Sequence, residues 1–277
     1  LPTLNVSDEP QTLEAERAMV RGWEARLSGE LRAIIRHLER RAGEDGRAQR
    51  QLELGDAESY DWDWPERYGI SVSGELGAAY AAVLAEAGFV ETPMLGAQEL
   101  SARWARARAG ELLRLGGRDS VVDLTRERLR ELVAETIDQG KSLRTLKNEL
   151  RADYVFSPSR AETIARTETA QAIGQGRRQS AMSRGQDEKR WTTAGDDRVD
   201  AFGGGSQPCI ANEGADWISA SEPFPSGHDT VPAHPRCRCD VQYRTSELRS
   251  APRVTRRRVE RDEQGRIAAI VEEVSGG

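Results

Sequence analysis

The chain has 277 residues, of which 31% are charged and only 5% aromatic, and its formal net charge is −6. This balance is typical of a soluble, helix-rich protein and argues against a generally basic protein that coats nucleic acid. No run of about 18 apolar residues occurs, so we expect no membrane-spanning helix. The chain shows no charged stretch followed by an apolar one at its start, so we expect no export by that route.

Residues 8–42 are predicted to form one long amphipathic helix, because apolar residues recur at steps of three and four. Asp8 and Pro10 suit its start, and Gly43 follows its end. Two interpretations stay open: an ordinary helix with one buried stripe, and a helix that docks on a larger partner. The next segment, 43–73, is largely polar and offers little to pack on, which favours docking.

An aromatic cluster follows in a chain that has few aromatic residues. Tyr60, Trp62 and Trp64 alternate with Asp61 and Asp63. The acidic residues disfavour stacking on nucleic acid, because the phosphates would repel them. Trp and Tyr often dominate protein interfaces, so the cluster either anchors this loop to the body or contacts another protein.

A run of helices is then predicted, joined by short connections that imply a compact bundle. Ser142 is the expected N-cap of the fourth helix, and Ser159 with Glu162 forms a capping box for the fifth. The expected ranges are about 74–88, 97–115, 124–139, 143–152, and from Ser157-Pro158-Ser159 towards Met182.

Glu168 lies on the apolar face of the fifth predicted helix, beside Ala161, Ala165 and Ala172. A carboxylate in that position must find a partner or shift its pKa. We favour a buried salt bridge or a bond to loop amides over a catalytic role. The partner is expected to be distant in sequence, and residues 191–240 are the place to look for it.

Residues 191–240 contain all three cysteines of the chain, Cys209, Cys237 and Cys239, together with His228 and His234. The segment is rich in Gly and Pro, so it turns often and builds little regular structure. Its apolar content is too small to offset the entropy of ordering it alone. A metal, a disulfide or packing against the preceding helices must therefore hold it.

Zinc prefers about four thiolate and imidazole ligands in a tetrahedron, and Cys209, His234, Cys237 and Cys239 supply such a set. A disulfide would leave one cysteine over and is the least favoured alternative. The third alternative is that the cysteines pack as small apolar groups. His228 is either a substitute ligand or a solvated loop residue.

The C-terminal part is predicted to form a β-hairpin, with a turn at Asp262-Glu263-Gln264-Gly265. Its first strand carries the most basic spot of the chain, Arg256, Arg257 and Arg258. These residues either contact DNA phosphate or an acidic partner, or they form a solvated edge strand whose charge blocks aggregation. We favour the second interpretation.

Several motifs occur in a fixed order and carry a resemblance to a known family. The positions that define them are Arg166 and Glu168 in Arg-Thr-Glu, Trp191, Asp196, Cys209, and His234 to Cys239, which includes Arg238. In this order and spacing, residues of about 120–245 resemble the Mu F-like minor head proteins of tailed bacteriophages, also called head morphogenesis proteins. One departure is Asn212, which stands where many relatives have the second Cys of Cys-x-x-Cys.

The resemblance and the patterns together imply a mainly α, α+β protein: a helical bundle, a small irregular Cys/His-containing α+β module and a C-terminal β-hairpin. We expect a long N-terminal helix and linker over 1–73 that docks on a partner. A Mu F-like head morphogenesis domain is expected over 74–245, and a hairpin extension over 246–277.

In function, the resemblance implies a non-enzymatic minor capsid protein that associates with the portal vertex and acts in head assembly and DNA packaging or ejection. Its expected partners are the portal protein and other capsid or scaffolding proteins, with double-stranded DNA as a further candidate and zinc as the candidate cofactor. Its expected location is the virion, and the host cytoplasm during assembly. The alternative is a metal-dependent enzyme or toxin-related module acting on nucleic acid, but the His-x-Glu of zinc deaminases is absent, because Pro235 and Arg236 follow His234.

Overall fold

The computed structural model describes most of the chain, including the helices of the bundle and the cysteines and histidines of the Cys/His module. Asp196 and the side chains of Arg256, Arg257 and Arg258 lie outside the described residues. The described ranges are 10–43, 52–91, 96–116, 120–195, 199 and 208–246, with the backbone of 254–261 and 267–274.

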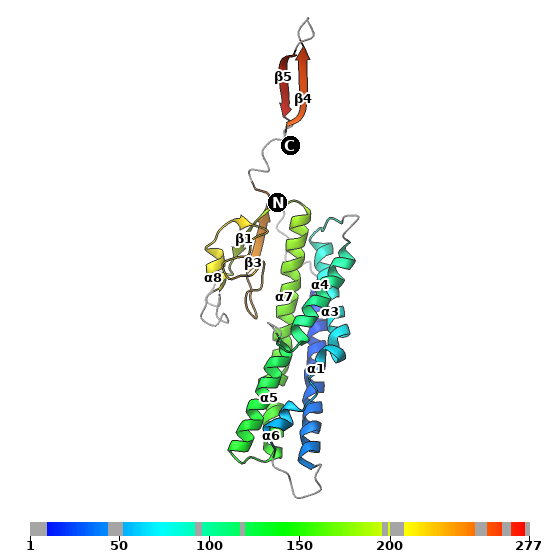
Figure 1. The fold of residues 1–277 in the computed structure, drawn as a ribbon, viewed down its shortest axis with the longest axis vertical. Coiled ribbons are helices and arrows are strands. Elements are labelled where there is room, and N and C mark those ends of the chain that lie inside the picture. The colour runs from blue at the N-terminus through cyan, green and yellow to red at the C-terminus, as the bar shows by residue number, and fades with distance from the viewer. Residues whose placement is uncertain are drawn as a thin grey trace.

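The body of the protein is a helical bundle, as the sequence predicts. Helices α1 and α7 run side by side along its long axis, with α3 and α4 beside one part of this pair and α5 and α6 beside the other (Figure 1). Among the described helices, none is both long and apolar enough to cross a membrane. The helices are α1 Pro10–Gly43, α2 Leu54–Glu58, α3 Trp64–Glu86, α4 Ala97–Leu113, α5 Val121–Asp138, α6 Leu143–Ala152 and α7 Pro158–Ser183, with a 3-10 turn at Tyr154–Phe156.

Capping side chains set where the helices begin. Ser142 caps α6 as predicted, by accepting a hydrogen bond from the backbone N–H of Thr145. The cap of α7 is Ser157 rather than the predicted Ser159, because Pro158 suits the first helical position. In the same way, Asp63 caps α3 ahead of Pro65, so this helix begins at Trp64 and not near residue 74.

The apolar stripe of α1 is part of the main core. Five of its side chains are at most 1% exposed, and α3 and α7 are its main neighbours. Docking was favoured because the next segment was expected to offer the helix little to pack on. That expectation was wrong, because the apolar stripe of α1 packs on other helices of the same chain. The predicted boundary after residue 73 also falls inside α3. The five side chains are Met19, Trp23, Leu27, Ile34 and Leu38.

The aromatic cluster anchors its loop internally. Tyr60, Trp62 and Trp64 are all buried, and the carboxylate of Glu30 accepts hydrogen bonds of 2.6 Å from the hydroxyls of Tyr60 and Tyr68. Burial and the bond to Glu30 raise the pKa of Tyr68 to about 12. The cluster thus joins α3 and the loop before it to α1.

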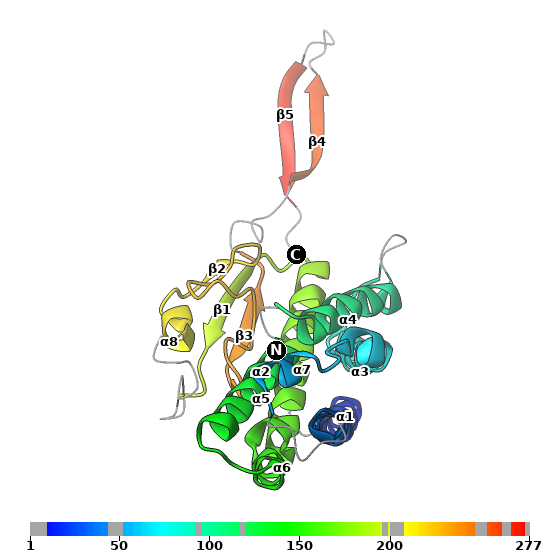
Figure 2. The same cartoon turned by 60° about the horizontal axis from the view of Figure 1, so that its bottom comes forward.

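A small module packs against the bundle. Its antiparallel sheet has the order β2-β1-β3, made of Ile218–Ser219, Glu188–Thr192 and Asp240–Arg244, and it lies between α7 and the short helix α8, Pro208–Glu213 (Figure 2). Its own core consists of Trp191, Cys209, Phe224, Val231 and Val241. The predicted hairpin is confirmed as a separate two-stranded sheet of β4, Val254–Arg261, and β5, Ile267–Val274.

The module approaches α7 most closely at Gly174. A side-chain Cβ at this position would lie 2.2 Å from the carbonyl oxygen of Val231 and 3.0 Å from the hydroxyl of Thr230. The distance to the carbonyl oxygen is far too short for real atoms, so glycine is what allows the loop to lie directly on the helix. Gly176 has the same role towards Val83 of α3.

Replacing Gly174 by Ala is expected to destabilise the protein by about 1–3 kcal/mol, although Ala is normally the better helix former. The cause is the contact of the added Cβ with Val231, and denaturant unfolding measures the effect. The matched control is Gly110→Ala, at an exposed glycine inside α4 with open space around it. It should stabilise by up to about 1 kcal/mol. Equal effects of the two substitutions would contradict a close contact at Gly174.

Candidate metal centre

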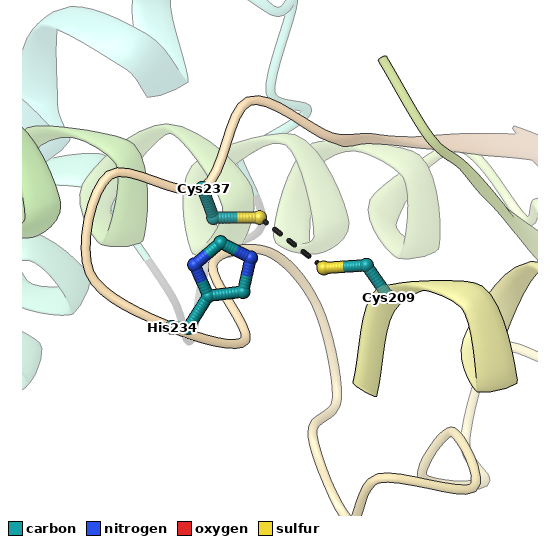
Figure 3. Close-up of side chains that lie close together, drawn as sticks. All are labelled: Cys209, His234 and Cys237. Carbon is teal, nitrogen blue, oxygen red and sulfur yellow. Dashed lines mark hydrogen bonds between the residues drawn. The ribbon is translucent and has the colours of Figure 1, made fainter. Parts of the chain in front are cut away.

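The candidate metal centre joins α8 to the loop that precedes β3. Cys209 lies in α8, and His234 and Cys237 lie in the loop. One ligand atom from each of these residues lies within 4.8 Å of the others, and the two sulfur atoms are 3.7 Å apart (Figure 3). Cys239 interacts with both thiols, although it is outside this tight group of three. The structure therefore brings the four predicted residues into one cluster.

The imidazole of His234 is held in one tautomer. Its Nδ1 lies 2.9 Å from the carbonyl oxygen of Pro235. A carbonyl can only accept, so Nδ1 carries a hydrogen, and Nε2 is the nitrogen that has the lone pair in the neutral ring. Nε2 is shielded from solvent. The ring thus presents a buried lone pair on the nitrogen that histidine commonly offers to a metal.

The three thiols share their protons unequally. Hydrogen bonds from the thiols of Cys209 and Cys239 stabilise the thiolate of Cys237 and hold its pKa well below the ordinary value. Hydrogen bonds of Cys209 to Cys237 and Cys239, together with burial, raise the pKa of Cys209. Cys237 is therefore the first of the three to ionise, and a thiolate is the form that binds soft cations.

The loop that carries these ligands rests on α7. The backbone N–H of Arg236 donates to the hydroxyl of Thr167 at 3.4 Å, and its guanidinium Nε donates to Thr163 at 3.0 Å. Arg236 adopts a positive φ of 59°, which turns the chain between His234 and Cys237. The Arg-Thr-Glu helix and the His-Pro-Arg-Cys-Arg-Cys loop are therefore in direct contact.

Glu168 forms the buried salt bridge that the sequence predicts, but with a different part of the chain. Both of its carboxylate oxygens accept from Arg108 on α4, at 2.7 and 2.8 Å. The expectation that this partner lies in residues 191–240 was wrong. Helix α4 covers this face of α7, and its long arginine side chain reaches across, which periodicity in one helix cannot reveal.

The other motif residues lie outside the Cys/His cluster. Arg166 is exposed and pairs with Glu162 and with Glu16 of α1. Trp191 is buried and packs edge to face on Phe224, with ring centres 5.1 Å apart. Arg238 is exposed. His228 bonds to the hydroxyl of Ser226 at 2.9 Å and is outside the group of three ligands, so its place is that of a loop residue.

Lys189 is a buried cation that the sequence reasoning missed. Its side chain is fully buried, and its Nζ donates to the carbonyl of Asp229 at 2.8 Å and lies 4.5 Å from the ring centre of Phe224. Burial, and then the charge of Arg178, lower the pKa of Lys189 to about 8. Strand alternation could have found it, because Lys189 stands two residues before Trp191 and must share its face.

Arg160 is a second buried cation that the sequence reasoning missed. Its guanidinium donates to the hydroxyl of Thr125 and to the carbonyls of Val155 and Val121. Burial lowers the pKa of Arg160 to about 10. It joins the start of α7 to the start of α5, and its role is structural.

Comparison with known proteins identifies the central segment. Residues 127–242 match the family described as phage Mu protein F like protein. The match begins inside α5 and ends inside β3, so it includes α7, the Cys/His cluster and the loop between them. No match to a curated protein or to a solved structure was found.

This segment therefore matches the phage Mu F-like family, as the resemblance predicted. The family is one of structural head proteins, so the match suggests a phage head morphogenesis protein.

Glu168→Gln is expected to cost about 1–3 kcal/mol of unfolding free energy, because Arg108 then loses its buried counter-charge and keeps the pair with the more exposed Glu111. Replacing both partners, as Arg108→Met with Glu168→Leu, should restore most of this loss. Arg166→Met is the control on the same helix. It breaks an exposed pair with Glu162 and should cost less than about 1 kcal/mol. A Glu168→Gln cost no larger than this control would contradict a stabilising role for the buried pair.

Because the pKa of the Lys189 amine is lowered in the folded state, the free energy of unfolding is expected to depend on pH. Between its folded pKa of about 8 and its ordinary value of 10.5, the unfolded chain holds a proton that the folded chain has released. The lysine therefore destabilises the fold fully below pH 8 and less as the pH rises through this window. The wild type should gain stability relative to Lys189→Met between about pH 7 and about pH 9.5. A constant difference in unfolding free energy would contradict the buried charge.

Proposed function

We propose that this chain is a minor head protein that associates with the portal vertex and acts in head assembly and in DNA packaging or ejection. The observation that carries the proposal is the Mu F-like segment, which contains the motif helix and the Cys/His loop in contact with each other. The proposed role is non-enzymatic, because the matched family is one of structural head proteins. Its place is the virion head, and its partners are the portal protein and other capsid or scaffolding proteins.

The exposed face of α1 is the proposed contact surface. The apolar stripe of this helix is used inside the protein, so a partner must bind the opposite, solvated face. That face carries a row of exposed arginines spaced mostly four residues apart, and within the described residues no carboxylate pairs with them. The arginines are Arg17, Arg21, Arg32, Arg36 and Arg40.

Such a row attracts an acidic protein surface, even though the whole chain has a net charge of −6. We therefore propose that the portal protein presents an acidic surface to α1. Double-stranded DNA would bring the same sign of charge through its phosphates, so the experiment must separate the two partners.

A pull-down with the portal protein tests the proposal. The triple variant Arg21→Gln, Arg32→Gln, Arg36→Gln keeps the core of α1 and should bind the portal about tenfold more weakly, a loss of about 1.4 kcal/mol. Raised salt should weaken wild-type binding as well, because exposed charges are screened. The matched control removes three exposed arginines elsewhere, as Arg103→Gln, Arg106→Gln, Arg144→Gln, and should bind like the wild type.

If both variants bind the portal protein equally well, the proposed contact on α1 is overturned. If neither the wild type nor the variants capture the portal protein, the portal association itself is overturned. If instead only the α1 variant loses affinity for a DNA duplex in a gel-shift assay, and portal binding is absent, the face binds DNA. Deleting residues 1–42 is not an alternative test, because it would remove Trp23 and Leu27 from the core. A portal gene directly upstream of the gene for this chain would support the proposal.

A further inference from the structure

We infer that Cys209, His234, Cys237 and Cys239 hold one zinc ion, which joins α8 to the loop before β3 and keeps that loop seated on α7. The inference is independent of the portal association. It rests on the separation of the sulfur atoms, on the orientation of the imidazole, and on how little apolar material holds the two segments together.

The sulfur separation fits a shared ion. In a tetrahedron with zinc–sulfur bonds of about 2.3 Å, two sulfur ligands lie about 3.8 Å apart. The sulfur atoms of Cys209 and Cys237 are 3.7 Å apart, and the ligand atom of His234 lies within 4.8 Å of both. A disulfide requires a sulfur–sulfur distance of about 2.05 Å, so the geometry is not that of a bond between them.

The imidazole is oriented as a zinc ligand commonly is. Histidines that bind metals usually donate their other ring N–H to a carbonyl or carboxylate, which fixes the tautomer and the direction of the ring. In His234 the bond from Nδ1 to the carbonyl of Pro235 has this role, and Nε2 is the ligand atom. Figure 3 shows the ring beside the two sulfur atoms.

Cys239 is the natural fourth ligand. It interacts with both Cys209 and Cys237, and it is separated from Cys237 only by the exposed Arg238. Three thiolates and one imidazole form a closed structural zinc set. Soft ligands of this kind also exclude Mg²⁺ and Ca²⁺, which prefer oxygen.

The ion would add stability to a module that has few apolar contacts. Cys209 and Cys237 are 28 residues apart, and among the described residues the apolar core of the module has five buried side chains. Between His234 and Cys237 the chain turns through Arg236, whose two bonds to α7 hold the loop against the bundle. Fixing both ends of this turn to one ion therefore orders the contact between module and bundle as well.

Metal analysis of the full chain is the first test. Protein purified without chelator should carry about one zinc per chain, and chelator should lower its melting temperature. Replacing the zinc with Co²⁺ should give sulfur-to-metal charge-transfer absorption and the intense visible bands of a tetrahedral site. Less than about half an equivalent of zinc, with no such cobalt spectrum and unchanged melting in chelator, would overturn the inference.

Variants then test the ligands. Cys209→Ser and His234→Ala should each lower the bound zinc to below about half an equivalent. His228→Ala is the matched control, because this histidine lies in the same segment but outside the ligand group, and it should keep the metal. Full zinc content in His234→Ala would overturn the assignment of His234.

A thiol-reactivity assay on the wild-type protein tests the inference without relying on the folding of any variant. In native wild-type protein the three cysteines should react slowly with a thiol reagent, and chelator should make them react much faster. Equal rates with and without chelator would contradict metal ligation. Recovery of Cys209 and Cys237 as a disulfide from protein purified under reducing conditions would also contradict it.

Discussion

The contact between the loop at Val231 and helix α7 at Gly174 is the constraint on which the arrangement of this protein depends. The described core of the module is too small to bury its sheet alone, and α7 packs against the module and provides further buried surface. The close approach is possible because Gly174 leaves the space that a side chain would fill. It also brings the residues after Val231, including His234 and Cys237, to the face of α7 where Arg236 meets Thr163 and Thr167.

Helix α7 contacts both parts of the molecule, and buried charged side chains with hydrogen-bond partners hold it on the bundle side. Glu168 is bound by two hydrogen bonds to Arg108, and Arg160 by three to α5 and the turn before α7. Buried ion pairs contribute little net stability, but they specify one arrangement because any other leaves a charge unpaired. The motif residue Glu168 therefore positions the helix, and the Cys/His loop is positioned by the helix in turn.

The proposed roles occupy different surfaces of the same fold. The arginines of α1 face solvent along the bundle, whereas the thiols and the imidazole lie within the module, where they join α8 to the loop. A partner that binds α1 would leave the cluster undisturbed. Loss of a structural ion would act first on the loop at Arg236 and on its contact with α7.

The sequence by itself determined most of the long helices, the hairpin, the resemblance to the Mu F-like family and the identity of the clustered residues, because periodicity, caps and motif spacing are local properties of the chain. Helix α6 and its cap at Ser142 agree with the prediction, as does the burial of Glu168. Only the tertiary structure decided that α1 belongs to the core, that Arg108 is the partner of Glu168, and that Lys189 is buried. Each of these depends on which segment lies across from a given face, and that is set by packing among elements distant in sequence.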